Sequence, residues 1–295
     1  MKKVLSIIVS YNFEPWLDKC LSSLLESSYP TDVLVVDNAS QDHSAARIRQ
    51  AYPQVKLIES RENLGFGKAN NLGFRYALEQ GYDTVFLVNQ DAWLKAGCLS
   101  ELMEQDYPED IGIISPVHYD GTEQALDQGF AHYTQALDLH AENAVADFVN
   151  AAFWLIPTKI LREIGGFSSI FYHYGEDSDY VNRLHYHGYQ LVINTKATAY
   201  HDRQGRLANQ SVEALRKSEF VYFLTEYANI NNSFSKAFAY AVLAALKKAF
   251  QALPKNTKIC GMYATLALQL LRKTNAVRRT RRQNKLFGIS NWLGE

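Results

Sequence analysis

Cysteine is scarce in the 295-residue sequence, in which Cys20, Cys98 and Cys260 lie far apart and in no metal-ligand spacing. An odd number of distant cysteines argues against a disulfide framework and predicts reduced thiols in a cytoplasmic protein. No apolar run reaches the ~18 residues that a membrane span needs. The apolar run 4–10 is too short for a signal peptide and predicts a buried first strand.

Glycine-rich phosphate loops are missing where nucleotide-binding proteins of several classes need them. A dinucleotide-binding domain carries its glycines directly after the first strand, but Ser10, Tyr11 and Asn12 stand there. The same absence argues against a sugar nucleotidyltransferase, which needs a glycine-rich basic loop at that point. No Gly-Lys-Ser/Thr loop occurs anywhere in the chain.

Acidic residues are almost absent from the C-terminal end. Residues 233–295 hold twelve of the 30 Lys and Arg but only one of the 31 Asp and Glu. The remaining 18 basic and 30 acidic residues give the preceding part a charge near −12, against +11 for the end. The basic residues at 233–295 could bind nucleic acid, but the strong negative charge of the preceding part argues against such a partner.

The first half of the sequence alternates short apolar runs with helical patterns. Strands are predicted at 5–10, 33–36, 55–59, 84–88 and 111–115, and helices near 16–26, 44–51, 68–80 and 97–103. This alternation predicts an α/β fold with a mostly parallel sheet flanked by helices. We expect a variable loop region at 116–147, a helix from about 177 to before 188, two short strands at 190–194 and 198–201, and only helices beyond Ser211.

Polar side chains follow three of the predicted strands. They are Ser10, Tyr11 and Asn12 after the first, Asp37 after the second, and Asn89, Gln90 and Asp91 after the fourth. Ligands of such sheets bind beyond the carboxyl ends of the strands. An acid there needs a partner, a metal or a ligand. Alternatively, Asp37 caps the next helix or turn.

Three motifs follow one another in the first part of the chain, namely Ser6-Ile7-Ile8-Val9-Ser10-Tyr11-Asn12, Val35-Val36-Asp37-Asn38-Ala39-Ser40 and Glu62-Asn63-Leu64-Gly65-Phe66-Gly67-Lys68-Ala69-Asn70-Asn71. They resemble the opening of glycosyltransferase family 2, and the last is typical of its rhamnosyltransferase-like branch. Asn89-Gln90-Asp91 lies where the family has an Asp-x-Asp signature. Gly175-Glu176-Asp177-Ser178-Asp179-Tyr180, with Arg183 and Gly188, is similar to the acceptor-side motif, and Tyr200-His201 to a late histidine. The resemblance covers residues 4–203.

The resemblance implies a GT-A fold and an inverting single displacement. The residues that it places at the nucleotide-sugar donor are Ser10, Tyr11, Asn12, Asp37, Asn63, Gly65, Gly67, Asn70, Asn89 and Gln90. Asp91 would ligate a divalent Mg²⁺ or Mn²⁺ on the diphosphate, with His201 as a second ligand that favours manganese. Asn89 departs from the signature because it replaces an acid, although it keeps a carbonyl oxygen.

The pair Glu176 and Asp177 offers a general base for the acceptor hydroxyl. A positioned carboxylate that accepts this proton gains typically ~10²–10⁴ in rate. We expect Asp177 to be the base and Glu176 to be the second candidate. The alternative is that both acids only favour a helix N-terminus. The adjacent rings at 171–174 could stack on a sugar or pack in the core.

These features predict two regions, a GT-A domain at 1–210 and a basic helical region at 211–295. The expected donor is dTDP-rhamnose, with a UDP-linked hexose as the alternative. The expected acceptor is a bacterial polysaccharide or a lipid-linked glycan. A non-catalytic sugar-nucleotide-binding assembly protein is a third interpretation, but it would not need both Asp91 and Asp177.

The basic helical region predicts peripheral association with the anionic inner face of a membrane. One helix face carries Ile259, Met262, Tyr263, Leu266, Ala267, Leu270 and Leu271. The preceding segment 238–246 is apolar almost all round, so we expect it to be well covered. The alternative is that these apolar faces pack on the GT-A domain or on a second subunit in a homodimer.

Overall fold

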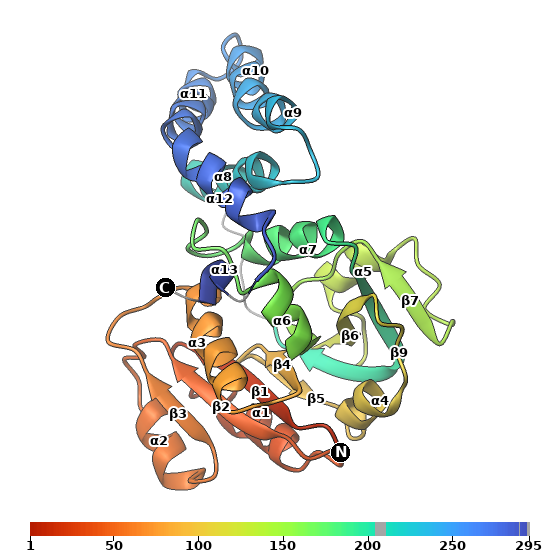
Figure 1. Ribbon diagram of the computed structural model, residues 1–295. Coiled ribbons are helices and arrows are strands. Elements are labelled where there is room, and N and C mark those ends of the chain that lie inside the picture. Colours follow the sequence, from red (N-terminus) through yellow and green to blue (C-terminus); the bar gives the residue numbers. More distant parts are fainter. Residues whose placement is uncertain (204–210, 289, 294–295) are drawn as a thin grey trace.

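The computed structural model describes residues 1–203, 211–288 and 290–293. A central sheet has helices on both faces, and a separate group of helices projects from it (Figure 1). In chain order the elements are β1 (Val4–Ser10), α1 (Leu17–Leu25), β2 (Asp32–Asp37), α2 (Ser44–Ala51), β3 (Lys56–Glu59), α3 (Phe66–Glu79), β4 (Thr84–Val88), β5 (Ala92–Leu94), α4 (Cys98–Glu104), β6 (Ile111–Asp120), α5 (Gln128–Thr134), β7 (Asn143–Ala146), β8 (Phe153–Pro157), α6 (Thr158–Ile164), α7 (Glu176–Tyr186), β9 (Gln190–His201), α8 (Val212–Ala228), α9 (Phe234–Phe238), the π-helix η1 (Ala239–Leu243), α10 (Ala244–Ala252), α11 (Thr257–Arg272), α12 (Thr274–Asn284) and α13 (Ser290–Leu293).

The described strands form one sheet in the order β3-β2-β1-β4-β8-β6-β9-β5, with β7 paired to β9. The first four strands are parallel. Strand β8 then runs antiparallel to both β4 and β6, and β6 is parallel to β9. Short strands β5 and β7 pair antiparallel with β9. The predicted α/β sheet flanked by helices is confirmed, with antiparallel strands in its second half.

Apolar side chains cover both faces of the sheet. In β1, Leu5 and Ile7 point into the core beneath α3, α6 and α7, whereas Val4 and Ile8 point into the core beneath α1, α2 and α4. This alternation is the two-residue period of a strand, and a parallel strand buried on both faces is apolar throughout. The buried strands therefore carry their polar residues at their ends, which fixes where a site can form.

The region 116–147 is more regular than predicted. Strand β6 continues to Asp120, and α5 and β7 follow it. Helix α5 begins where the Asp127 carboxylate accepts a hydrogen bond from the Phe130 amide. The loop prediction failed because the short β7 is a strand only through its pairing with β9, which follows much later in the sequence.

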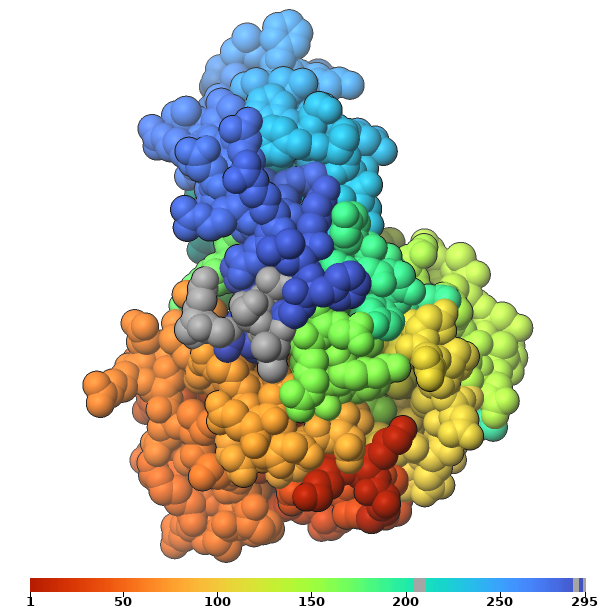
Figure 2. Space-filling model, in the orientation of Figure 1, coloured from red at the N-terminus to blue at the C-terminus, as the bar shows by residue number. Residues whose placement is uncertain are grey.

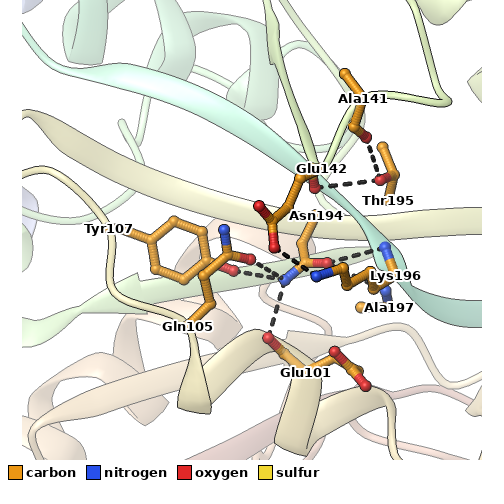
Figure 3. Close-up of polar contacts among 9 residues, drawn as sticks. All are labelled: Glu101, Gln105, Tyr107, Ala141, Glu142, Asn194, Thr195, Lys196 and Ala197. Carbon is orange, nitrogen blue, oxygen red and sulfur yellow. Dashed lines mark hydrogen bonds and ion pairs between the residues drawn. The ribbon is translucent and has the colours of Figure 1, made fainter.

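The two strands predicted at 190–194 and 198–201 are one strand, β9, with an irregularity beside Asn194. The Asn194 amide nitrogen contacts the Glu101 carbonyl, Gln105 and the Tyr107 hydroxyl at 2.7–2.9 Å (Figure 3). Its carbonyl oxygen accepts hydrogen bonds from the amides of Lys196 and Ala197. Asn194 thus compensates for the interrupted ladder and fastens β9 to the end of α4.

The residues beyond Ser211 are helical where the structure describes them, as predicted. The α11 face that we assigned to a membrane packs instead inside the helical region, where Met262, Leu266 and Leu270 are buried against α8, η1 and α10. That prediction was wrong because helical spacing shows an apolar face but not what covers it. The expectation that 238–246 is well covered was also wrong, since Leu243 and Leu246 are exposed.

The C-terminal end returns to the sheet region. The Asn71 side chain of α3 donates to the carbonyls of Phe167 and Trp292, and Leu293 packs in the core. The predicted boundary near residue 210 falls at 204–210, outside the described residues. Within the described ranges no helix is long and apolar enough to cross a membrane. The three cysteines are free thiols.

Candidate active site

A cavity of about 510 Å³ lies beyond the carboxyl ends of β1 and β4, between the segment before α3 and the start of α7. Its lining comprises Val9, Tyr11, Asn38, Asn63, Gly65, Phe66, Asn89, Gln90, Asp91, Tyr133, Asn150, Ala151, Ala152, Tyr172, His173, Tyr174, Glu176, Asp177 and Arg203. The structure therefore places the acid after β4 and the acids of α7 on one cavity, although they lie far apart in the sequence.

Eight of the predicted site residues line this cavity, namely Tyr11, Asn63, Gly65, Asn89, Gln90, Asp91, Glu176 and Asp177. Six do not, namely Ser10, Asn12, Asp37, Gly67, Asn70 and His201. The contacts of these six residues show what each supports.

Asp37 closes the turn after β2. Its carboxylate accepts hydrogen bonds from the hydroxyls of Ser10 and Ser40 and from the Ser40 amide. Asn12 holds the neighbouring loop, because its side chain accepts from the Gln41 amide at 2.9 Å. These contacts match the turn interpretation of Asp37. A contact of Asp37 with the nucleotide-sugar donor stays a prediction.

Asn63 and Gly65 shape the wall beside α3. The Asn63 side chain accepts hydrogen bonds from Asn38 at 3.0 Å and from the Gly65 amide at 2.9 Å. Gly65 has φ +77°, and a Cβ there would lie 1.9 Å from the Tyr172 carbonyl oxygen. Only glycine fits this backbone and this close approach.

Gly67 and Asn70 have roles within α3 itself. A Cβ on Gly67 would lie 3.0 Å from the Phe167 side chain and 3.5 Å from Glu176, so this glycine lets α3 pack closely on the start of α7. The Asn70 amide donates to the Phe66 carbonyl one turn earlier. Both therefore support the cavity wall from behind.

Tyr11 and Gln90 join the ends of β1 and β4. The Tyr11 amide donates to the Gln90 side chain at 2.6 Å, and that side chain returns a hydrogen bond to the Tyr11 carbonyl at 3.1 Å. This reciprocal pair fixes the loop that carries Asp91 relative to β1.

Asp91 and His201 come together through the pairing of β5 with β9. Ala92 lies opposite His201 in that pairing. The His201 Nε2 atom lies 3.3 Å from the Asp91 carboxylate and 3.3 Å from the side-chain nitrogen Nδ2 of Asn89. Both side chains are buried. His201 Nδ1 lies 3.8 Å from the Asp127 carboxylate, a residue that the sequence analysis did not select.

This donor set fits a metal that takes few protein ligands. The described residues contain no group of three His, Cys, Asp or Glu side chains that could hold an ion. One carboxylate and one imidazole are nevertheless adjacent, and the carboxylate lines the cavity. Mg²⁺ and Mn²⁺ at nucleotide sites complete their shells with phosphate oxygens and water, so Asp91 with His201 would be a sufficient protein contribution to such a site.

Glu176 and Asp177 begin helix α7 and face the cavity. Burial raises the pKa of the Glu176 carboxyl to about 7, and the nearby Asp177 charge adds to the shift. Burial also raises the pKa of Asp177. The Glu176 Oε2 atom is buried and has no hydrogen-bond partner among the described protein atoms. A pair of perturbed carboxyls in a cavity is typical of a site for proton transfer.

Helix α7 is held from behind by buried polar contacts. The Arg183 guanidinium donates to the carbonyls of Ile164 and Gly166. The Asn284 amide donates to both carboxylate oxygens of Asp179, at 3.1 and 3.3 Å. Burial raises the pKa of Asp179 to about 6, although the Arg183 charge opposes the shift. Asp179 and Arg183 therefore fix the helix and do not line the cavity.

Sequence reasoning missed several lining residues. Asn38 lies inside a quoted motif and stands next to Asp37, so the motif could have suggested it. Arg203 follows His201 closely, and its guanidinium Nε lies 3.6 Å from Asp127. Tyr133 comes from the region that we expected to be a loop, Asn150 lies just after that region, and no pattern marked either residue.

Solved structures with the same fold include two that hold a nucleotide or a nucleotide sugar. TarS of S. aureus with UDP matches with a TM-score of 0.56 and 14% identity, over 99% of this chain and 92% of that one. The mannosyltransferase PcManGT of Pyrobaculum calidifontis with GDP-Man and Mn²⁺ matches with a TM-score of 0.58 and 18% identity, over 99% and 84%. The sheet, its helices and this likeness define the class as a GT-A fold.

The sequence comparisons name the family. The family model described as "Glycosyl transferase family 2" matches residues 6–165, more than half of the chain. An N-acetylglucosaminyl-diphospho-decaprenol L-rhamnosyltransferase of Mycobacterium tuberculosis is 25% identical, over 77% of this chain and 86% of the relative. An undecaprenyl-phosphate mannosyltransferase of Micrococcus luteus is 36% identical, over 35% of this chain and 43% of the relative. The chain belongs to glycosyl transferase family 2 and is a glycosyltransferase.

Proposed function

We propose that this glycosyltransferase moves rhamnose from dTDP-rhamnose to a hydroxyl of a lipid-linked or polysaccharide acceptor, with inversion at the sugar. The observation that supports the proposal best is the shared cavity. Asp91, beside His201, lines it on the β4 side, and Asp177 lines it on the α7 side. A donor diphosphate on the first side and an acceptor hydroxyl on the second would meet at the sugar between them.

The two sides of the cavity have separate tasks in this proposal. Asp91 and His201 would hold a divalent cation, which supplies positive charge to the departing diphosphate. Arg203 adds a fixed cation beside the same strand end. The oxygen of the acceptor hydroxyl bonds to the sugar while the bond between the sugar and the diphosphate breaks. Asp177 accepts the proton that this hydroxyl loses. Glu176 lines the same cavity beside this base.

The proton-transfer role gives a pH dependence. A base works only when it is ionised, and a raised pKa moves the loss of the ionised form to higher pH. We therefore expect kcat/KM to fall on acidification at a pH above 3.8, the ordinary pKa of aspartate. The profile should be measured from about pH 3 to about pH 9. Glu176→Gln should keep this acidic limb, and a limb with its midpoint at or below 3.8 would contradict the role of Asp177.

The donor proposal is supported by similarity to the mycobacterial rhamnosyltransferase. A UDP-linked hexose is the alternative. Gly65 lines the cavity, and the Tyr172 backbone fills the space beside it, so this glycine shapes the wall but does not decide between the donors. Calorimetry with Mg²⁺ or Mn²⁺ decides between the donors. We expect dTDP-rhamnose to bind more tightly than UDP-glucose and UDP-galactose, and the reverse order would refute the donor while leaving the transferase assignment in place.

We also propose a lipid-linked acceptor and action in the cytoplasm at the inner face of the membrane. The mycobacterial relative carries a decaprenol-linked acceptor in its name. The sequence division into a catalytic part, 1–210, and a basic part, 211–295, suits this arrangement, because the basic part can meet an anionic surface while the acidic part carries the cavity. A homodimer through the helical region is the alternative arrangement.

A further inference from the structure

The helical region presents an exposed apolar row that differs from the face predicted from sequence. Leu243, Leu246, Phe250 and Leu253 are 51%, 45%, 78% and 54% exposed. Their spacing of three, four and three residues places them on one side of η1 and α10. The opposite side of the same helices carries Ala241, Val242, Ala245 and Ala249, which are buried in the helical core.

Lysines surround this exposed row, which we call the α10 row (Leu243, Leu246, Phe250 and Leu253). Lys247 lies within it, and Lys236 and Lys255 lie before and after it, all exposed. The segment 227–288 contains twelve Lys and Arg and no Asp or Glu. Two of these cations are used internally: Lys248 pairs with Glu219, and Arg281 donates to backbone carbonyls. The outward charge of the segment remains strongly positive.

The α10 row lies at the end of the molecule. Helices α10 and α11 form the part of the helical region farthest from the sheet (Figure 1). The space-filling view shows this region projecting from the body of the molecule (Figure 2). Helix α10, which carries Leu246 and Phe250 of the row, therefore lies apart from the acidic catalytic part.

We propose that the α10 row and its lysines are the surface by which this protein binds an anionic lipid bilayer. The leucines and Phe250 enter the headgroup boundary, and the lysines contact the anionic headgroups. A bilayer fits better than a second copy of the chain, because a two-fold contact through this face would set lysines against lysines. The inference names the surface behind the membrane association in the proposed function.

The test is co-sedimentation of the full chain with vesicles. Wild type is expected to pellet with phosphatidylglycerol/phosphatidylcholine vesicles and not with phosphatidylcholine alone. The double variant Leu246→Gln/Phe250→Gln should bind at least ~10-fold less to the anionic vesicles, because two exposed apolar groups lose their burial. Lys247→Gln/Lys255→Gln should weaken binding at low salt and have less effect at high salt.

Tyr222→Gln is the matched control, since this residue of α8 is 57% exposed and outside the row. It should bind vesicles like wild type. All variants should keep the wild-type circular dichroism and donor affinity, which separates this inference from the donor proposal. Equal pelleting of wild type and Leu246→Gln/Phe250→Gln would overturn it. The inference would also be overturned if wild type did not bind the vesicles but formed a dimer, and if this variant abolished that dimer.

Discussion

Asp177→Asn is expected to lower the transfer rate by roughly 10²–10⁴-fold, the usual contribution of a positioned general base. Asp177 lines the cavity at the first turn of α7, and its carboxyl pKa is raised by burial. Asparagine keeps the shape but cannot take the proton. Donor affinity should barely change, because the base acts on the acceptor in the transition state. Single-turnover rates and donor calorimetry measure the two quantities separately.

Glu176→Gln is the matched control for this prediction. Glu176 is the neighbour of Asp177, lines the same cavity and has a pKa of about 7. The Glu176→Gln enzyme should keep most of its activity if Asp177 is the base. If Glu176→Gln is the inactive variant, the two roles are exchanged. If Asp177→Asn loses donor affinity as strongly as rate, Asp177 belongs to the donor side.

Asp91→Asn is expected to remove metal-dependent turnover. Loss of a direct ligand should exceed the roughly 10- to 100-fold cost of altering a residue that only supports a metal ligand. The fold should survive, because Asp91 stands at a strand end where the cavity begins and asparagine has the same size. Turnover against metal concentration, with circular dichroism as the folding measure, provides the check.

Asp127→Asn is the control for this metal assignment. The Asp127 carboxylate lies 3.8 Å from His201 Nδ1 and does not line the cavity. Asparagine can still cap α5 through its carbonyl oxygen. We expect a shift in metal dependence no larger than about 100-fold. Wild-type activity of Asp91→Asn at low metal concentration would contradict the assignment.

The strand-end part of the site could be predicted from sequence because an apolar strand must end where polar residues begin. Asp91 after β4 is visible in this way, whereas Asp177 at the start of α7 was predicted from the resemblance of its motif. The contact of Asp91 with His201 could not be predicted from sequence, because it depends on β5 pairing antiparallel with β9 across more than a hundred residues. Asp127 joins that cluster through β6, whose continuation the sequence did not reveal.

The helical region shows a second reason for failure. Sequence periodicity correctly gave helices after Ser211. It could not decide which apolar face lies inside, because that depends on how α8, η1, α10 and α11 pack together. Leu266 became core, whereas Phe250 is exposed. A hydrophobic sequence pattern does not distinguish these two apolar residues, so only the packed structure identifies the surface that stays exposed to a partner.

The most direct test of the glycosyltransferase site is release of nucleoside diphosphate from a panel of sugar nucleotides, with and without divalent metal. We expect the wild-type protein to release the diphosphate from dTDP-rhamnose, to stop when the metal is chelated, and to lose this activity in both Asp91→Asn and Asp177→Asn. Metal-independent release that persists unchanged in both variants would show that the cavity between β4 and α7 is not where the sugar is transferred.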